Sequence, residues 1–184
     1  MLTTNSKKKY EKIKKIIAHG INKKLKKHFW HRESSLAGHN FRLPNHLAAL
    51  GISQLKRLNG FNKKRRIIAK KYDIFLNSFN GFFEVQKISK NLSHSYQMYT
   101  FLIDSKYRNQ LLYYLRSKNI EASAHFDPPL HKQNYLKKYY KITLKNTDIL
   151  AKKIISLPMH PDLKDNDINR VNKTIKDWYK KNVK

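Results

Sequence analysis

Residues 38–55 read Gly-His-Asn-Phe-Arg-Leu-Pro-Asn-His-Leu-Ala-Ala-Leu-Gly-Ile-Ser-Gln-Leu, a polar loop that leads into an apolar helix. Pro44 suits the first turn of that helix, because the amide hydrogen that proline lacks has no helical partner there. Small residues at positions 48, 49, 51 and 53 make the helix slim, so another backbone could approach it closely. Its larger side chains trace one face: Leu43, Leu47, Leu50, Gln54 and Leu58.

The loop before this helix is a candidate anion site. It combines Gly38, the amide of Asn40 and the guanidinium of Arg42 just ahead of a helix N-terminus. Free N–H groups and the helix dipole favour phosphate at such a place, and arginine adds a planar fork of donors. An asparagine before a helix that begins with proline is also ordinary loop chemistry. The residues alone leave both interpretations open.

Upstream of this loop, the sequence predicts a strand end, a helix and an irregular connection. Residues 3–4 read as the end of a short strand, and Asn5 or Ser6 can cap the helix that comes next. Gly20 closes that helix, with His19 as a packing residue at its end. Residues 21–41 show no regular period, and connections of that length are usually functional or disordered.

Downstream, the pattern predicts a helical linker and then a compact α/β lobe. Asn59-Gly60 is read as an interruption after which a second helix covers residues 61–79. The buried side of this helix is expected to hold Ile68, Tyr72, Phe75 and Phe79. Strands are expected over 82–88, 96–103 and 122–126, and extended chain at 156–158 before a proline. Further helices are expected over residues 106–118 and 145–155 and from about residue 165. The last of them has an apolar stripe: Ile168, Val171, Ile175 and Trp178.

The composition limits the functions to be considered. The formal net charge of +28 could indicate a nucleic-acid or anionic-membrane binder. However, 32 of the 40 basic residues are lysines scattered over every predicted helix, and Lys, Asn, Ile and Tyr share AT-rich codons. A composition bias explains this charge better than a dedicated nucleic-acid site. With no cysteine, no membrane-length apolar run and no apolar signal region, we expect a cytoplasmic protein.

The second polar cluster is His125-Phe126-Asp127-Pro128-Pro129-Leu130-His131, which comes after a predicted strand. Two histidines across a rigid double-proline turn could face one pocket and bind an anion or transfer protons. A structural turn with surface histidines fits the same residues equally well. No third ligand for zinc is evident. The chain also lacks a glycine-rich phosphate loop and a nucleophile-elbow motif, so it offers little as a stand-alone catalyst.

Four segments in order resemble the pyridoxal-phosphate (PLP) nucleotide-sugar aminotransferases of the DegT/StrS type. Residues 38–43 resemble the family stretch G-x-N-(Y/F)-R-(M/L), and residues 48–55 resemble A-A-L-G-x-x-Q-L. Residues 125–131 are similar to H-(Y/F)-x-P-x-H, and residues 155–163 to L-S-L-P-x-x-P-x-L. The start of the chain and His19-Gly20 also resemble the segment that comes after the family's glycine-rich strand.

The resemblance implies the C-terminal half of a fold-type I aminotransferase of the α/β class. Residues 1–43 would be a remnant of the large PLP domain and residues 44–80 the connecting helices. Residues 81–184 would form the small α/β domain, with a short, mainly antiparallel sheet. The family's Schiff-base lysine and its pyridinium-pairing aspartate lie upstream of the Thr3-Thr4-Asn5 region, and no residue here matches either motif. We therefore expect a truncated, catalytically incomplete chain.

The same resemblance implies roles for four residues. Asn40 would reach across a dimer to the PLP phosphate, and Arg42 would line that shared site. His125 and His131 would lie near the sugar substrate, although Phe126 stands where many members have tyrosine. The pattern points to enzymes that transfer an amino group, usually from glutamate, to a UDP-linked keto-deoxysugar for surface glycans.

These observations support three hypotheses. In the first, the chain is a fragment of a sugar aminotransferase, which would form a homodimer or pair with a separately encoded N-terminal half. In the second, it is a non-catalytic subunit that pairs with such a half or with a full-length paralogue. In the third, it is a basic nucleic-acid-binding module, but its aromatic residues occur at core periods rather than alternating with lysine. We expect no specific nucleic-acid partner, no membrane partner and no metal.

Overall fold

The structure is a computed structural model that describes residues 2–21, 28, 30–31, 33–139 and 141–183. The chain divides into two compact units, residues 1–56 and residues 57–184. The first contains helix α1 (Lys7–Ile16) and the start of helix α2 (Asn45–Asn77). The second contains the rest of α2 and all the strands in the described part of the chain. None of the described helices combines the length and the apolar composition needed to cross a membrane.

In the first unit, α1 begins where the sequence predicts. The Oγ of Ser6 accepts a hydrogen bond of 3.4 Å from the Lys9 amide, which caps the helix. At the other end the Gly20 amide donates to the Lys15 carbonyl at 2.8 Å, and Gly20 has a φ of +71°. Residues 2–4 pair with no described segment. Because a strand needs a partner, the strand end at residues 3–4 stays a prediction that this sequence alone does not test.

Helix α2 runs without interruption, so the break predicted at Asn59-Gly60 is wrong. A glycine inside a helix costs about 1 kcal/mol relative to alanine, which weakens a helix without ending it. A Cβ added at Gly60 would meet no other atom, so nothing around it requires a turn. The C-terminal part of the helix is fixed by burial of four side chains, as predicted for Ile68 and Tyr72: Ile68, Ala69, Tyr72 and Leu76.

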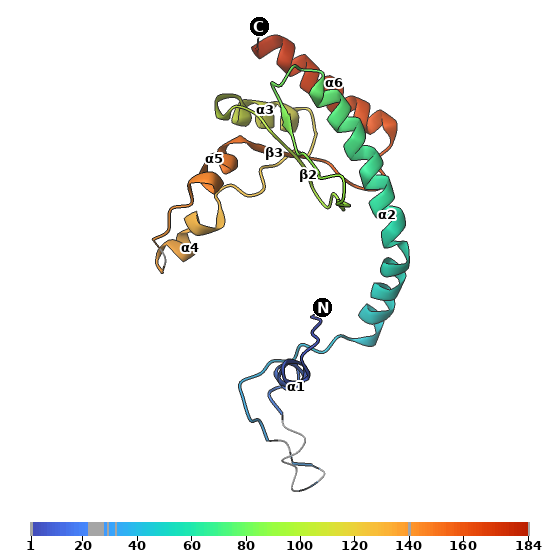
Figure 1. Ribbon diagram of the computed structural model, residues 1–184, viewed down its shortest axis with the longest axis vertical. Helices are drawn as coiled ribbons and strands as arrows, with labels where there is room; N and C mark the ends of the chain where they lie inside the picture. Colours follow the sequence, from blue (N-terminus) through green and yellow to red (C-terminus); the bar gives the residue numbers. More distant parts are fainter. Residues whose placement is uncertain (1, 22–27, 29, 32, 140, 184) are drawn as a thin grey trace. The chain divides into compact units, whose positions relative to one another are not determined.

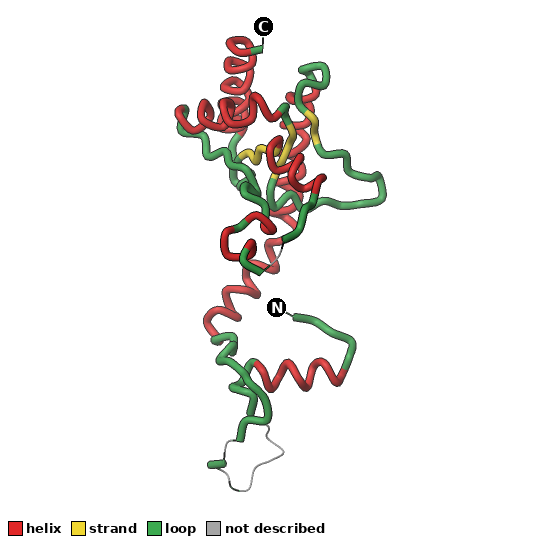
Figure 2. Tube along the Cα trace, turned by 90° about the vertical axis from the view of Figure 1, so that its left-hand side faces the viewer, coloured by secondary structure: helices red, strands yellow, loops and turns green. Residues whose placement is uncertain are grey.

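The second unit is built on a three-stranded antiparallel sheet in the order β1-β2-β3, which confirms the expected fold class. The strands are β1 (Glu84–Val85), β2 (Tyr99–Leu102) and β3 (Ile154–Leu157). Figure 2 shows how short they are beside the helices of this unit. The strand predicted over 122–126 is reduced to one bridge between Ser123 and Ser156, because the chain turns away immediately afterwards.

Helices cover this sheet and bury its apolar side chains. They are α3 (Ser105–Ser117), α5 (Lys145–Lys153) and α6 (Asp165–Asn182), and the sequence predicts all three. The short turn η2 (Leu130–Lys132) and helix α4 (Asn134–Lys137) are not predicted. Figure 1 shows α6 beside the C-terminal part of α2. Just beyond the end of α2, the ring centroid of Phe79 lies 4.7 Å from that of Tyr179.

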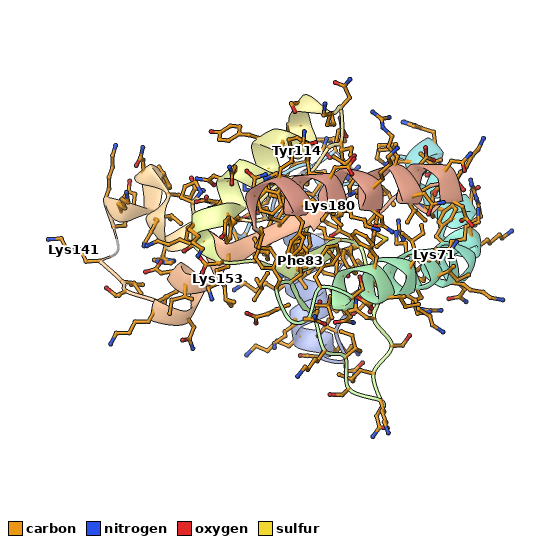
Figure 3. The ribbon with its side chains drawn as sticks, turned by 90° about the horizontal axis from the view of Figure 1, so that it is seen from above. Lys71, Phe83, Tyr114, Lys141, Lys153 and Lys180 are labelled. Carbon is orange, nitrogen blue, oxygen red and sulfur yellow. The ribbon has the colours of Figure 1, made fainter. Side chains whose placement is uncertain are left out.

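The core of this unit is aromatic and aliphatic, and its lysines lie outside it. Figure 3 shows Phe83 among the interior side chains and Lys141 extending from the periphery. The predicted stripe of α6 is fully buried: Ile168, Val171, Ile175 and Trp178. The spacing of apolar residues therefore predicted this helix and its inward face correctly.

Candidate functional site

The loop from Gly38 to Arg42 is fastened to the end of α1 by backbone hydrogen bonds. The His39 amide donates to the Ile16 carbonyl at 2.8 Å, and the Phe41 amide donates to the Ile17 carbonyl at 3.1 Å. In return, the His39 carbonyl accepts a hydrogen bond of 3.1 Å from the His19 amide. The backbone on both sides of Asn40 is therefore held against α1.

Two glycines allow this close approach. A Cβ at Gly38 would lie 2.2 Å from the Gly20 nitrogen and 2.8 Å from the Ile16 carbonyl oxygen. A Cβ at Gly20 would lie 1.8 Å from the Leu36 carbonyl oxygen. None of these three distances is compatible with a side chain, so both positions need glycine. His19 contributes through its backbone, because its carbonyl accepts from Ser34 Oγ at 2.7 Å while its side chain is exposed.

Asn40 and Arg42 are both exposed, and neither side chain has a partner among the described residues. Their donors are therefore free on a backbone that is fixed. Between them, the ring of Phe41 stacks on that of His39, with centroids 4.9 Å apart. An amide and a guanidinium presented in this way fit the oxygen atoms of a phosphate.

In the second unit, the two predicted histidines are each held by a separate partner. His125 Nδ1 lies 2.9 Å from the Oγ of Ser156, a buried residue of β3. His131 Nε2 lies 2.9 Å from Asp148 Oδ1 on α5. Lys132 Nζ lies 2.8 Å from the same Asp148 oxygen. The turn between the histidines contains cis peptide bonds at His125–Phe126 and Asp127–Pro128.

Charge pairing at Asp148 is reflected in its pKa. The hydrogen bond from Lys132 lowers the pKa of the Asp148 carboxyl below its ordinary value, and His131 adds to this effect. The carboxylate therefore stays ionised and keeps both neighbours in place. Sequence reasoning missed Asp148, because a single acidic residue in a lysine-rich helix reads as solvent-exposed.

Sequence reasoning also missed Arg108, the one buried basic residue among those that the structure describes. It lies on α3 and forms an ion pair with Asp127. Asp127 is in the middle of residues 125–132, which we call the histidine turn. An arginine in the first turn of an amphipathic helix gives no signal that it will be buried, since it normally faces water.

Phe126 occupies the position at which the family often has tyrosine. Its side chain is 67% exposed and its ring meets that of His125 edge-on, with centroids 5.2 Å apart. In the described ranges no three His, Asp or Glu side chains gather as a metal site would require. The polar chemistry of this turn therefore rests on its histidines and on the groups that hold them.

The sequence profile of the DegT/DnrJ/EryC1/StrS aminotransferase family matches residues 1–176. The chain belongs to this family of aminotransferases. Pyridoxal phosphate is the cofactor on which the chemistry of this family depends. The match confirms the resemblance inferred from the four motifs.

Curated relatives of this chain include sugar-nucleotide enzymes. GDP-perosamine synthase of Escherichia coli O157:H7 is 29% identical over 97% of this chain, which covers 47% of that protein. A UDP-4-amino-4,6-dideoxy-N-acetyl-beta-L-altrosamine transaminase of Helicobacter pylori is 32% identical over 88% of this chain and 43% of that protein. The chain thus spans about half the length of the curated relatives that it matches.

A solved structure shares this fold. Helicobacter pylori PseC, an aminotransferase involved in the biosynthesis of pseudoaminic acid, superimposes with a TM-score of 0.84 and 27% identity. The match covers 97% of this chain and 48% of PseC. Both units of the chain therefore have counterparts in an aminotransferase of twice the length.

Proposed function

We propose that this chain supplies the C-terminal half of an aminotransferase that transfers an amino group, from glutamate, to a UDP-linked keto-deoxysugar. The observation that carries the proposal is the loop that presents Asn40 and Arg42. Its backbone is fixed to α1 by hydrogen bonds and by two obligatory glycines, while neither side chain has a partner among the described residues. A loop built in this way is suited to hold an anionic group in one position.

In this proposal two residues bind the cofactor and two others bind the sugar substrate. Asn40 would donate its amide to the cofactor phosphate of a neighbouring subunit, and Arg42 would add a guanidinium to the same shared site. Bound pyridoxal phosphate supplies the electron sink for amino-group transfer. His125 and His131 would contact the sugar through the ring nitrogens that Ser156 and Asp148 leave free. A neutral imidazole nitrogen at such a place can accept or hold a proton.

No residue of this sequence matches the lysine motif of the family, so we infer that the covalent lysine belongs to the large domain outside these 184 residues. That domain could be joined to this sequence, or be supplied by a separate N-terminal half or a full-length paralogue. The start of α2 offers a surface for it, with three leucines exposed by 47–65%: Leu47, Leu50 and Leu55. Apolar side chains at this density on one helix favour burial against another chain.

The experiment is reconstitution with the N-terminal half of a family member that ends before the residue matching Leu2. Glutamate-dependent amination of a UDP-linked keto sugar is expected only when both halves are present. Borohydride reduction followed by mass spectrometry should then find PLP attached to the partner half. Turnover by this chain alone, or stoichiometric PLP on one lysine of this chain, would contradict the proposal.

The hypothesis of a non-catalytic subunit predicts a different result in the same assay. If the chain serves a full-length paralogue, it should co-purify with that protein and alter its substrate affinity without adding turnover sites. Counting trapped PLP per complex separates the two cases. One PLP per pair of halves indicates complementation, and one PLP per paralogue, regardless of added chain, indicates the subunit.

A further inference from the structure

Arg108 is buried at the junction of three segments. Its Nη2 donates to the Ala151 carbonyl at 3.1 Å and its Nε donates to the Lys152 carbonyl at 3.2 Å. The same guanidinium pairs with the carboxylate of Asp127. Its side chain is only 9% exposed, and a buried guanidinium is costly unless its donors are satisfied. Here the guanidinium donates hydrogen bonds to the C-terminal end of α5 and to the histidine turn.

The histidine turn, residues 125–132, is fastened to α5 and β3 at three places. His125 contacts Ser156 at one end, and His131 contacts Asp148 at the other. Between them, Asp127 is connected through Arg108 to the carbonyls of Ala151 and Lys152. The residues of α5 and β3 that take part in these contacts all lie between positions 148 and 156. Arg108 thus adds a connection between the middle of the turn and the end of α5, besides the contacts at Ser156 and Asp148.

These contacts also decide which ring nitrogens are available. Ser156 takes Nδ1 of His125, which leaves Nε2, and Asp148 takes Nε2 of His131, which leaves Nδ1. Neither remaining nitrogen has a partner in the part of the chain that the structure describes. The two imidazoles thus leave opposite nitrogens without a hydrogen bond, an arrangement that is lost if either ring rotates or the turn moves.

We propose that Arg108 is a positioning residue that holds the histidine turn through Asp127 and so fixes the free nitrogens of His125 and His131. Its importance for catalysis rests on the proposed function, in which these nitrogens meet the sugar. The positioning itself is a property of this chain and can be measured without turnover. A bidentate guanidinium is needed because one group must serve two carbonyls and a carboxylate, which a lysine ammonium cannot do in a fixed geometry.

The test uses imidazole nitrogen NMR spectra of the full chain, with His125 and His131 assigned through His125→Gln and His131→Gln. In the wild type, each ring should show one dominant tautomer or hydrogen-bonded form. Arg108→Lys and Asp127→Asn should both shift these two sets of signals towards averaged values. Asp127→Asn keeps the contacts of Arg108 to the carbonyls, so it isolates the connection to the turn and carries the test if Arg108→Lys does not fold.

Arg170→Gln is the matched control, because Arg170 donates to the Lys118 carbonyl at 2.7 Å and does not touch the turn. It should leave both histidines unchanged. Unchanged His125 and His131 signals in folded Asp127→Asn would overturn the proposal. In a reconstituted enzyme, Asp127→Asn should also weaken binding of the UDP-linked sugar by about tenfold, because displaced histidines would lose hydrogen bonds to the sugar. If the histidine signals depend on Asp127 but no sugar binds the wild type, the proposed function fails and the positioning role stands.

Discussion

Tyr99 donates a hydrogen bond of 2.7 Å from its hydroxyl to the carboxylate of Asp73 and so connects β2 to α2. The centroid of its ring lies 5.0 Å from that of Tyr72. The hydroxyl of Tyr72 donates a hydrogen bond of 3.2 Å to the Pro158 carbonyl. Both tyrosines are buried. Burial raises the pKa of Tyr99 and of Tyr72 well above the ordinary value of 10, and the hydrogen bond to Asp73 raises the pKa of Tyr99 further.

These tyrosines should make the second unit sensitive to alkali. A raised pKa in the folded state means that the folded state holds the proton more tightly than the unfolded state. The associated stability is therefore complete below pH 10 and is lost as pH rises above it. Each tyrosine should lower the free energy of unfolding by about 1.4 kcal/mol per pH unit above that point.

Urea unfolding of Tyr72→Phe at pH values from neutral to strongly alkaline checks this expectation. The variant should lose less stability than the wild type above pH 10, where only the wild type has this buried hydroxyl to ionise. Tyr113→Phe serves as the control, since Tyr113 is 78% exposed. Parallel alkaline slopes for the wild type and Tyr72→Phe would show that this tyrosine ionises without unfolding.

The lowered pKa of Asp148 leads us to expect a loss of stability in acid. Lys132 lowers the pKa of its carboxyl below the ordinary 3.8, so the contribution is present above pH 3.8 and is lost as pH falls through the lower folded value. Asp148→Asn should remove this contribution at neutral pH and flatten the acid-unfolding curve. Near-ultraviolet circular dichroism between neutral pH and strong acid measures it, with the exposed Glu121→Gln as control. Identical curves for Asp148→Asn and the wild type would contradict the assignment.

The glycine contact in the first unit predicts opposite effects for three alanine substitutions. Gly38→Ala and Gly20→Ala place a methyl group within 2.2 and 1.8 Å of backbone atoms, so the loop must move. Such overpacking costs about 1–3 kcal/mol. Gly60→Ala meets open space inside α2 and should stabilise the helix by roughly 0.5–1 kcal/mol.

Hydrogen exchange of the amides of His39 and Phe41 is the appropriate measurement, because the two units can open separately. Both amides should exchange faster in Gly38→Ala and at an unchanged rate in Gly60→Ala. Retained protection in Gly38→Ala would mean that the loop accommodates a Cβ by some other shift.

The sequence predicted elements whose pattern is local and missed contacts that span long distances along the chain. The apolar spacing of α6 predicted both the helix and its buried residues, from Ile168 to Trp178. The break predicted at Asn59-Gly60 was wrong, because the burial of Ile68 and Tyr72 outweighs a local preference for a turn. The contacts of Arg108 reach carbonyls 43 and 44 residues away, and no spacing rule reports a carbonyl left free at the end of a helix.

The site was predicted unevenly for the same reason. Asn40, Arg42, His125 and His131 were singled out as members of polar clusters and were given roles by resemblance. The structure shows the local setting of each, and the roles stay predictions. The sequence did not predict Ser156 and Asp148, although these residues bind the ring nitrogens of the two histidines. A serine in a strand and an aspartate among lysines carry no signal until the fold brings them to a ring nitrogen.

The net charge of +28 predicts weak, non-specific affinity for nucleic acid. Dispersed lysines release counterions from phosphates but have no means of reading bases. Binding to two unrelated duplexes should be equal and should fall steeply between about 50 and 200 mM salt. Fluorescence anisotropy with labelled duplexes measures both properties. Tight binding that persists at physiological salt for one sequence alone would revive the hypothesis of a nucleic-acid-binding module.

Asn40 provides the sharpest test of the shared cofactor site. In a reconstituted enzyme, Asn40→Ala should remove a hydrogen bond to a charged phosphate, which is worth about 1.5–3 kcal/mol. PLP retention measured by equilibrium dialysis should weaken by roughly ten- to a hundredfold. Folding should be unchanged, since the side chain of Asn40 is exposed and has no partner among the described residues.

Mixed dimers then distinguish a contact across the dimer from a contact within one subunit. One assembly carries Asn40→Ala, and the other carries a partner half without the covalent lysine. If Asn40 serves the neighbouring subunit, one site of the hybrid receives both defects and the other receives neither. Activity and full-affinity PLP binding should therefore return at one site in two. If Asn40 serves its own subunit, each hybrid site keeps one defect, and the mixture should remain as inactive as its parents.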